Sequence, residues 1–303
     1  MKWRMFICAI CFLIGGCSLN IPLEDQFSDP DAITDVLSAR SLLASAYKAM
    51  PQQIFQLSVM SDDFCPSQHL NKDMSLQGLY SWREVEMTEL AGTLWAGYYA
   101  VIAEVNALLA RIDAVVTLDE TEKLEKMRIV CETKALKSWC YFDLLRLFAP
   151  RYEGNENKDG IILKKRVELD FLPRSSVKEC VTEIRTLLNE ARNVDNTQKN
   201  VYWLSDKAVA YLQVELELYA GNYPAVLELT KDLETEYPES VLGADVYKYL
   251  WSSENSDARI FGKYQLEQIY MDIRFDTFEK GDYLVLSQNV DYEEEDIRKE
   301  WSE

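Results

Sequence analysis

The chain has 303 residues, a formal net charge of −19 and a pI near 4.6. Hydrophobic residues make up 48% and charged residues 27%, which excludes an intrinsically disordered chain, a collagen-like fibre and a polytopic membrane protein. The acidity argues against nucleic acid and against anionic lipid head groups as partners, because both need a basic surface.

The first residues have the pattern of a bacterial export signal. Lys2 and Arg4 precede an apolar run, residues 5–14, which suits a signal sequence and is too short to span a bilayer. A Gly-Gly pair then precedes Cys17, as in a lipobox, where the signal is cleaved before an acylated cysteine. We expect residues 1–16 to be a lipoprotein signal peptide and Cys17 a lipid anchor, the only contact with the membrane. An ordinary secretory signal with an incidental cysteine is the alternative.

The remainder is predicted to be mainly helical, with irregular loops and little β structure. Asp29 and Pro30 have the pattern of a helix N-cap and a first helical residue, and Pro51 ends that segment. A second helix is predicted around residues 95–112. A third begins with a capping box at Asp119 and is long. Its predicted core stripe is Leu124, Met127, Cys131, Ala135, Trp139, Phe142 and Leu145.

Three further helices follow in the second half of the chain. A capping box at Ser176 and Glu179 opens the first of them. The other two form a helix–turn–helix over residues 205–237, with Gly221 in a tight turn, which is typical of a tetratricopeptide hairpin.

Four cysteines lie beyond the predicted signal and anchor. They are Cys65, Cys131, Cys140 and Cys180. Because they show no CxxC spacing, we expect buried thiols rather than a disulfide scaffold or a metal site.

Residues 155–160 imitate the first half of a calcium-binding loop. The twelfth position, which needs a bidentate glutamate, is Arg166. The segment is therefore interpreted as a polar turn, and no metal or other cofactor is expected.

The polar and aromatic stretch over residues 58–93 is the candidate ligand site. Its candidate binding residues are Asp62, Asp63, His69, Asn71, Tyr80 and Trp82. Indole and phenol rings stack on the C–H faces of sugars, and carboxylates and amides accept hydroxyl protons. The alternative is that one or both rings only pin the loop to the core. Four other tryptophans are expected in the core: Trp95, Trp139, Trp203 and Trp251.

The sequence gives little support for catalysis. It has no nucleophile elbow, phosphate-binding glycine loop, dinucleotide fingerprint or HExxH pattern. Its single histidine, His69, excludes multi-histidine zinc sites and argues against a Ser-His-Asp triad. A hydrolase built on Asp62 or Asp63 is a minor alternative, because glycosidase carboxylates normally lie far apart in the sequence. We therefore expect a protein that is not an enzyme.

Several segments resemble one known family in their order along the chain. They are the lipobox, Asp29-Pro30, Ser61-Asp62-Asp63, the pattern Trp95-x-x-Tyr98-Tyr99-x-x-Ile102-x-x-x-Asn106-x-Leu108-Leu109, residues 132–148, residues 172–176 and the turn around Gly221. These segments resemble the SusD/RagB family of Bacteroidetes nutrient-binding lipoproteins. Lys137 stands where the family usually has arginine, and Ala149 where it has glycine.

The resemblance implies a tetratricopeptide-type helical scaffold, anchored by lipid in the outer membrane and facing the cell exterior. It implies a SusC-like TonB-dependent transporter as partner, to which captured glycans are delivered. We expect one SusD-like domain over residues 17–303. The late Arg-Tyr-Ala-Glu-like helix of the family is not visible, so we expect a compact member or one that lacks part of the sugar-binding region. A peptide binder, or a structural adaptor of the transporter without its own ligand site, remains the alternative.

Overall fold

The computed structural model is mainly helical, with one very small sheet. It describes residues 33–67, 74–168, 171–192, 202–236, 259–262, 273–275, 283–285, 293 and 296. The helices are α2 (Val36–Lys48), α3 (Ile54–Met60), α4 (Met74–Tyr80), α5 (Glu84–Arg111), the 3₁₀ turn η1 (Ile112–Ala114), α6 (Glu120–Phe148), α7 (Val177–Ala191), α8 (Asp206–Tyr219) and α9 (Tyr223–Glu236). The strands are β1 (Cys65–Pro66), β2 (Ile273–Phe275) and β3 (Tyr283–Val285).

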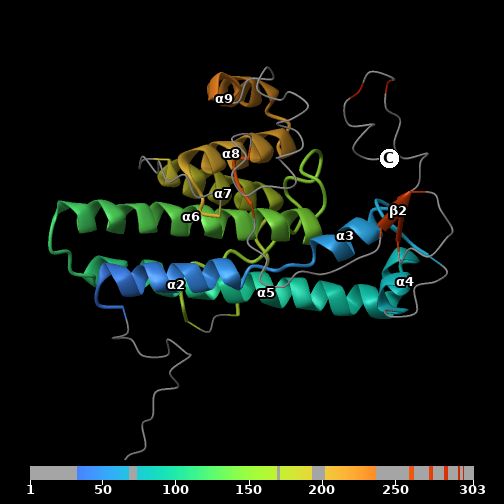
Figure 1. The fold of residues 1–303 in the computed structure, drawn as a ribbon, viewed down its shortest axis with the longest axis horizontal. Helices are drawn as coiled ribbons and strands as arrows, with labels where there is room; N and C mark the ends of the chain where they lie inside the picture. Colours follow the sequence, from blue (N-terminus) through green and yellow to red (C-terminus); the bar gives the residue numbers. More distant parts are fainter. Residues whose placement is uncertain are drawn as a thin grey trace, which may run out of the picture.

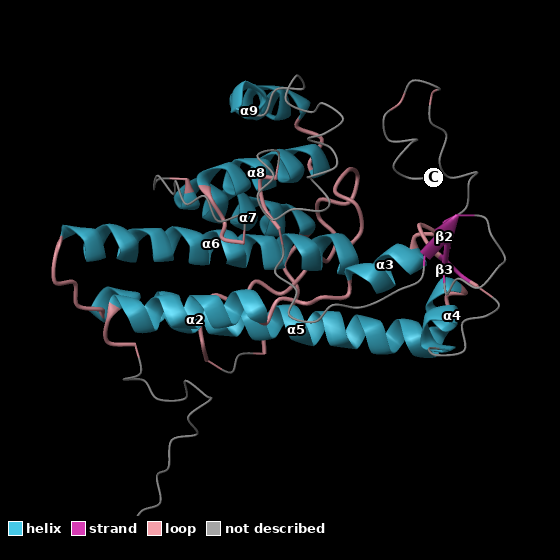
Figure 2. Ribbon diagram, in the orientation of Figure 1, coloured by secondary structure: helices cyan, strands magenta, loops and turns pink. Residues whose placement is uncertain are grey.

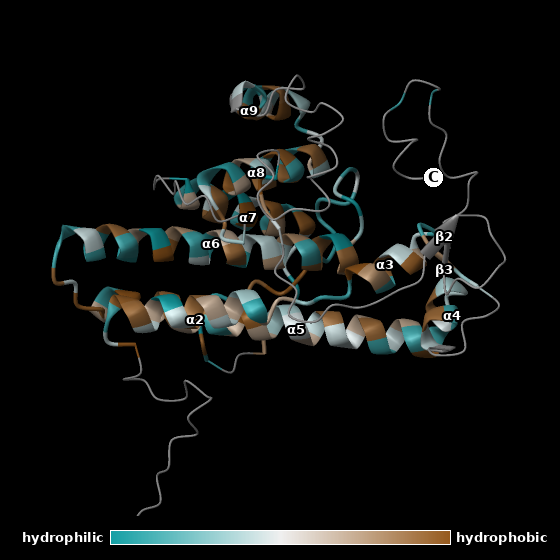
Figure 3. Ribbon diagram, in the orientation of Figure 1, coloured by the Kyte–Doolittle hydropathy of each residue, from teal (hydrophilic) through white to brown (hydrophobic). Residues whose placement is uncertain are grey.

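The helices stack in layers. α2 and α5 lie side by side, α6 packs on both, and α7, α8 and α9 follow in sequence on the other side of α6 (Figure 1). Hydrophobic and hydrophilic residues alternate along most of these helices (Figure 3), as amphipathic helices between layers require. By length and composition alone, Glu84–Ala114 is apolar enough to cross a membrane. The helix packs against α2, α4 and α6, and 39% of its apolar window is buried.

The first described helix begins later than the sequence predicts. Asp35 is the N-cap of α2 and forms a capping box with Ser38, whose backbone N–H donates to the Asp35 carboxylate at 2.7 Å. The prediction that Asp29 caps this helix is therefore wrong, although Asp29 and Pro30 themselves lie outside the described residues. Asp35 outcompetes the earlier signal because Ser38 completes the reciprocal hydrogen bond.

The predicted stripe of α6 is correct only in its second half. Asp119 is the predicted N-cap, but its capping box is only half formed: the Glu122 N–H donates to Asp119, whereas the Glu122 carboxylate accepts from the Leu118 N–H. Ala135, Phe142 and Leu145 are buried. Leu124 and Met127, however, are 52% and 46% exposed. The inward face of that part of α6 instead carries Ile129, Glu132 and Thr133. A hydrophobic stripe fails as a guide there because a charged side chain occupies the interior.

The helices of the second half form where the sequence predicts them. Ser176 and Glu179 make the predicted capping box of α7. α8 and α9 form the predicted hairpin, and Gly221 between them has a φ of 71°. Cys140 and Cys180 are buried thiols, as expected, whereas Cys65 and Cys131 are only half-buried.

The loop at residues 155–160 is a turn that completes the start of α7. The Lys158 and Glu156 carbonyls accept hydrogen bonds from the Val177 and Lys178 backbone N–H groups, both at 2.9 Å. These donors belong to the first turn of α7, where a helix leaves its N–H groups without internal partners. The interpretation as a polar turn is confirmed.

A small sheet lies beside α3 and α4 (Figure 2). Its strand order is β1-β3-β2, with β1 antiparallel and β2 parallel to β3. The sheet therefore joins the α3–α4 connection to segments more than 200 residues later in the chain.

Polar side chains inside the bundle hold the extended segment that follows α6. The Tyr99 hydroxyl donates to the Ile162 carbonyl and the Tyr141 hydroxyl to the Lys164 carbonyl, at 2.9 and 2.6 Å. The Asn106 amide also donates to the Lys164 carbonyl, and its oxygen accepts from Lys137 Nζ at 2.6 Å. Burial lowers the pKa of Lys137 to about 8.

A buried ion pair connects α2 to α6. Arg40 Nη1 donates to both oxygens of Glu132 at 2.9 Å, and Glu125 accepts from the same guanidinium. The Glu132 side chain is 1% exposed. Burial raises the pKa of Glu132 to about 7, although Arg40 opposes this shift. Because the folded-state pKa lies above the unfolded value near 4.5, the stability contribution of this carboxyl declines as pH rises between these values.

We expect Arg40→Ala to lower the free energy of unfolding by about 3–5 kcal/mol near pH 8, because the buried, charged Glu132 loses the guanidinium that compensates its charge. The loss should be smaller at pH 5, where the buried carboxyl is protonated. Urea unfolding at the two pH values measures both effects. Arg128→Ala is the matched control: Arg128 is 32% exposed and lies 3.7 Å from Glu125, so its loss should be about 1 kcal/mol or less. Equal losses for Arg40→Ala at both pH values would contradict the assignment.

Candidate functional site

The sequence-predicted site lies at the end of the bundle where α3, α4 and α5 are connected. Four of its six residues are described: Asp62, Asp63, Tyr80 and Trp82. His69 and Asn71 lie outside the described residues. Asp62 and Asp63 follow α3, whereas Tyr80 is the last residue of α4 and Trp82 lies in the turn into α5.

The Tyr80 hydroxyl lies beside the Cys65 thiol and within the electrostatic influence of Asp62. The Cys65 thiol and the Asp62 carboxylate both raise the pKa of the Tyr80 hydroxyl, the hydrogen bond to Cys65 being the larger cause. The Tyr80 ring packs against a small cluster formed by Val59, Leu76 and Leu79. Tyr80 thus pins the loop, as one of the sequence alternatives holds, while its hydroxyl is hydrogen-bonded to Cys65.

Trp82 has an unusual backbone conformation. The Trp82 N–H donates to the Leu79 carbonyl at 3.0 Å, and the Arg83 N–H donates to the Gly78 carbonyl at 2.8 Å. This pair of hydrogen bonds is a Schellman cap, which places a left-handed residue, usually glycine, just past the helix. Here that residue is Trp82, with a φ of 55°, and its side chain is 62% exposed.

Asp62 occupies the equivalent position after α3. Its φ is 66°, and the Asp63 N–H donates to the Ser58 carbonyl at 3.0 Å, which closes the same six-residue turn. Asp62 and Trp82 are the two non-glycine residues with positive φ in the described part of the chain. Both belong to the candidate site.

The third cap of this kind ends α8 and uses glycine. The Gly221 N–H donates to the Leu218 carbonyl and the Asn222 N–H to the Glu217 carbonyl, at 3.1 and 2.9 Å. The same turn is therefore built without strain at α8 and with a strained, exposed indole at α4. A left-handed tryptophan is a genuine outlier, and such strain concentrates at ligand-binding sites.

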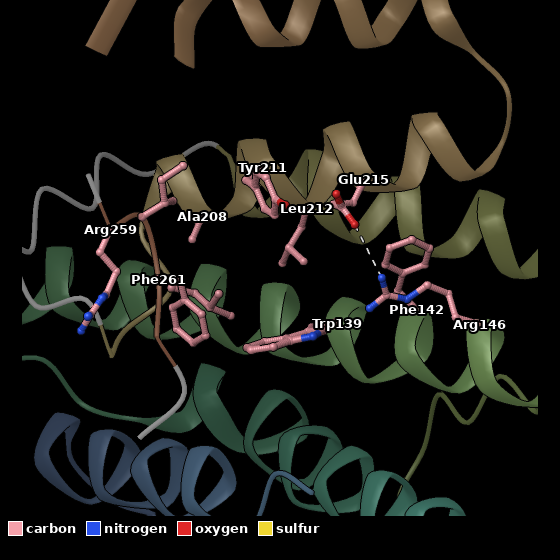
Figure 4. Close-up of a pocket in the computed structure, with 11 residues that line it drawn as sticks. Trp139, Phe142, Arg146, Ala208, Tyr211, Leu212, Glu215, Arg259 and Phe261 are labelled. Carbon is pink, nitrogen blue, oxygen red and sulfur yellow. Dashed lines mark ion pairs between the residues drawn. The ribbon is translucent and has the colours of Figure 1, made fainter. Parts of the chain in front are cut away.

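A second hollowed region follows the C-terminal half of α6, and we name it the α6 groove. Its first hollow, of about 440 Å³, lies between α6 and α8. Its second, of about 580 Å³, lies between α6, α5 and the start of α3. Trp139, Arg146 and Phe261 line both hollows. Figure 4 shows the first hollow, with Trp139 and Phe142 on α6 facing Tyr211, Leu212 and Glu215 on α8.

The polar groups of the α6 groove centre on Arg146. Its guanidinium lies 2.6 Å from Asp143 and 3.5 Å from Glu215, and stacks over the Phe142 ring with 4.5 Å between the guanidinium carbon and the ring centroid. The Tyr98 hydroxyl donates to the other Asp143 oxygen at 2.8 Å. Burial and the Glu215 charge raise the pKa of Tyr211. The groove thus combines an apolar floor with charged groups along one side.

Sequence reasoning did not identify the α6 groove. It placed Trp139 in the core; Trp139 does pack against the core, but it is half-buried and also lines both hollows. Its ring packs edge-on against Phe261, with centroids 4.9 Å apart. Trp95 and Trp203 are likewise half-buried and pack against the core, Trp95 beside Tyr99 and Phe148 and Trp203 beside Tyr47. Trp251 lies outside the described residues.

Catalytic and metal chemistry receive no structural support within the described ranges. Asp62 and Asp63 are both exposed, and no group of three or more His, Cys, Asp or Glu side chains there has a metal-binding arrangement. The fold places the chain in the class of layered helical proteins.

The comparison with protein families gives the particular family. The SusD-like family model described as starch-binding and associating with the outer membrane matches residues 24–214. This match covers well over half of the chain, and the chain belongs to the SusD family. No curated protein matches the chain significantly.

Solved structures share the fold at low identity. A sugar-binding protein from Bacteroides vulgatus, described as putative in its name, has a TM-score of 0.62 at 20% identity over 76% of this chain and 54% of its own. Surface glycan-binding protein A from Bacteroides fluxus has a TM-score of 0.56 at 19% identity, over 83% of this chain and 54% of its own. A laminarin-binding SusD-like protein has a TM-score of 0.51 at 19% identity, over 67% of this chain and 44% of its own. The chain thus spans about half the length of these proteins.

We expect Trp82→Gly to raise the free energy of unfolding by about 1 kcal/mol, because glycine adopts the left-handed conformation without strain. Gly221→Ala is the mirror experiment at the cap of α8. A Cβ there meets open space, so the φ of 71° alone should cost about 1 kcal/mol. Urea unfolding of both variants measures the effects. A destabilised Trp82→Gly variant would show that packing of the indole outweighs the strain.

Proposed function

We propose that the protein is a non-enzymatic cell-surface lipoprotein that captures glycans and delivers them to a SusC-like TonB-dependent transporter of the outer membrane. Membership of a family described as starch-binding and associating with the outer membrane supports this proposal. The resemblance in fold to sugar-, laminarin- and glycan-binding proteins supports it further. Delivery to a transporter rests on the family resemblance alone.

The observation that carries the proposal is the exposed indole of Trp82 on a left-handed backbone. The Trp82 side chain strains its helix cap and gains little from burial. A role in contacting a ligand explains why tryptophan stands there. An indole face stacks on the C–H face of a pyranose ring, and the Asp62 and Asp63 carboxylates of the same candidate site accept hydrogen bonds from hydroxyl groups. The six predicted residues, with His69 and Asn71 included, remain the proposed site.

We expect Trp82→Ala to weaken glycan binding by about 1–3 kcal/mol, as for a central aromatic anchor. Trp82→Gly should weaken it equally while stabilising the fold, which separates binding from stability. Trp82→Phe should retain part of the affinity because a flat ring remains. Affinity electrophoresis in gels containing starch, laminarin, or host and microbial polysaccharides measures the effect.

Tyr223→Ala supplies the matched control, because Tyr223 is also an exposed aromatic residue, at 63%, but lies on α9. Its retardation should equal that of the wild type. If a polysaccharide retards the wild type and the Trp82→Ala variant equally, the proposed site is refuted. A wild type that no polysaccharide retards would favour the adaptor function or a peptide ligand. Turnover of an oligosaccharide, abolished by Asp62→Ala or Asp63→Ala, would instead indicate a hydrolase.

The lipid anchor is a separate part of the proposal. Residues 1–16 would be removed as a signal peptide, and acylated Cys17 would hold residues 17–303 as one domain at the outer membrane. The basic start, the apolar run and the Gly-Gly-Cys sequence support this processing. These residues lie outside the described ranges.

We expect cells that express the full chain to incorporate labelled palmitate into this protein, and Cys17→Ala to abolish the label, because the thiol is the proposed acylation site. Cys8→Ala, within the predicted signal, is the control and should leave labelling intact. The Cys17→Ala protein should also be absent from the outer-membrane fraction. Label that persists in Cys17→Ala would exclude the anchor.

A further inference from the structure

The α6 groove has the size and lining of a ligand site. Volumes of about 440 and 580 Å³ for its two hollows lie within the usual range for small-molecule sites, which are mostly apolar with a few convergent polar groups. In the first hollow, Trp139, Leu212 and Phe261 supply apolar surface (Figure 4). Arg146 and Glu215 face each other across one end of it, 3.5 Å apart.

These groups suit a neutral sugar better than an ion. The lining of the groove carries two guanidinium groups, on Arg146 and Arg259, and two carboxylates, on Asp143 and Glu215. The formal charges cancel, so neither a free anion nor a free cation finds an excess of opposite charge there. Both members of the Arg146–Glu215 pair remain partly exposed, at 44% and 32%. A hydroxyl group both donates and accepts, so it can bind the carboxylate and the guanidinium together. The indole of Trp139 offers a flat surface beside them.

Helix α3 connects the groove to the candidate site around Asp62, Asp63, Tyr80 and Trp82, which we call the Trp82 loop. Ile54 and Leu57 of α3 line the second hollow, and Asp62 follows the other end of the same helix. α3 has seven residues, a length of about 10 Å. A linear ligand that leaves the loop along α3 therefore reaches the groove after a short distance.

We propose that the α6 groove is a second carbohydrate subsite, which binds a distal part of the same neutral glycan chain that the Trp82 loop holds. The inference rests on the proposed glycan-binding function. Two linked contacts on one chain bind more tightly than either alone, since the second becomes intramolecular. Long oligosaccharides should therefore bind more tightly than short ones, and the gain should depend on the groove.

The test compares oligosaccharide lengths in wild-type protein and in Leu212→Trp, which fills the first hollow. The probes are maltotriose with maltoheptaose, and laminaritriose with laminarihexaose, titrated by calorimetry. Leu212→Trp should weaken binding of the long oligosaccharide about fivefold or more and leave the trisaccharide affinity unchanged. Leu227→Trp is the matched control, because Leu227 is 67% exposed on α9 and outside the groove.

A second variant guards against misfolding of the first. Tyr211→Ala removes a ring from the groove wall and should be tolerated, since Tyr211 is 46% exposed. Thermal unfolding checks that both variants are folded. A length-dependent gain that persists in both variants, or no gain in the wild type, overturns the second subsite and leaves the Trp82 site standing. A wild type that binds neither series overturns both.

Discussion

The central constraint on this fold is that charged side chains of α6 are buried between layers and must find partners. Glu132 pairs with Arg40 of α2, Lys137 is hydrogen-bonded to Asn106 of α5, and Asp143 is hydrogen-bonded to Tyr98 of α5. Each partner compensates for the loss of water around a buried polar group. The three pairs follow one another along α6, so they fix how far α2 and α5 can slide along it. Apolar packing alone would tolerate several such positions.

Local signals in the sequence predict the helices well but predict the inward face of α6 poorly. The capping box at Ser176 and the turn at Gly221 depend on neighbouring residues only and form as expected. Asp119 is the predicted N-cap, but its capping box is only half formed. The stripe through Leu124 and Met127 is wrong because it treats every buried position as apolar. Glu132 is buried there, and only its partner on α2, 92 positions away in the sequence, explains why.

The candidate site divides in the same way. Composition alone points to the loop with Tyr80 and Trp82, because polar and aromatic residues gather there. The strained conformation of Trp82 is invisible in the sequence, since no pattern requires a tryptophan at the position after α4 where glycine is normal. The α6 groove is even harder to predict from the sequence. Trp139 fits the core stripe, and its open face depends on where α8 and Phe261 come to lie.

Charge and strain together limit what the proposed ligand can be. A chain with a net charge of −19 repels acidic polysaccharides at a distance, and the Asp62 and Asp63 carboxylates face solvent at the loop. The guanidinium of Arg146 does not offset this, because two carboxylates flank it. Binding must then come from ring stacking and hydroxyl hydrogen bonds, which neutral glycans provide. The strained backbone of Trp82 is then explained, because it exposes a ring whose stacking supplies the binding that ionic contacts to a neutral glycan cannot.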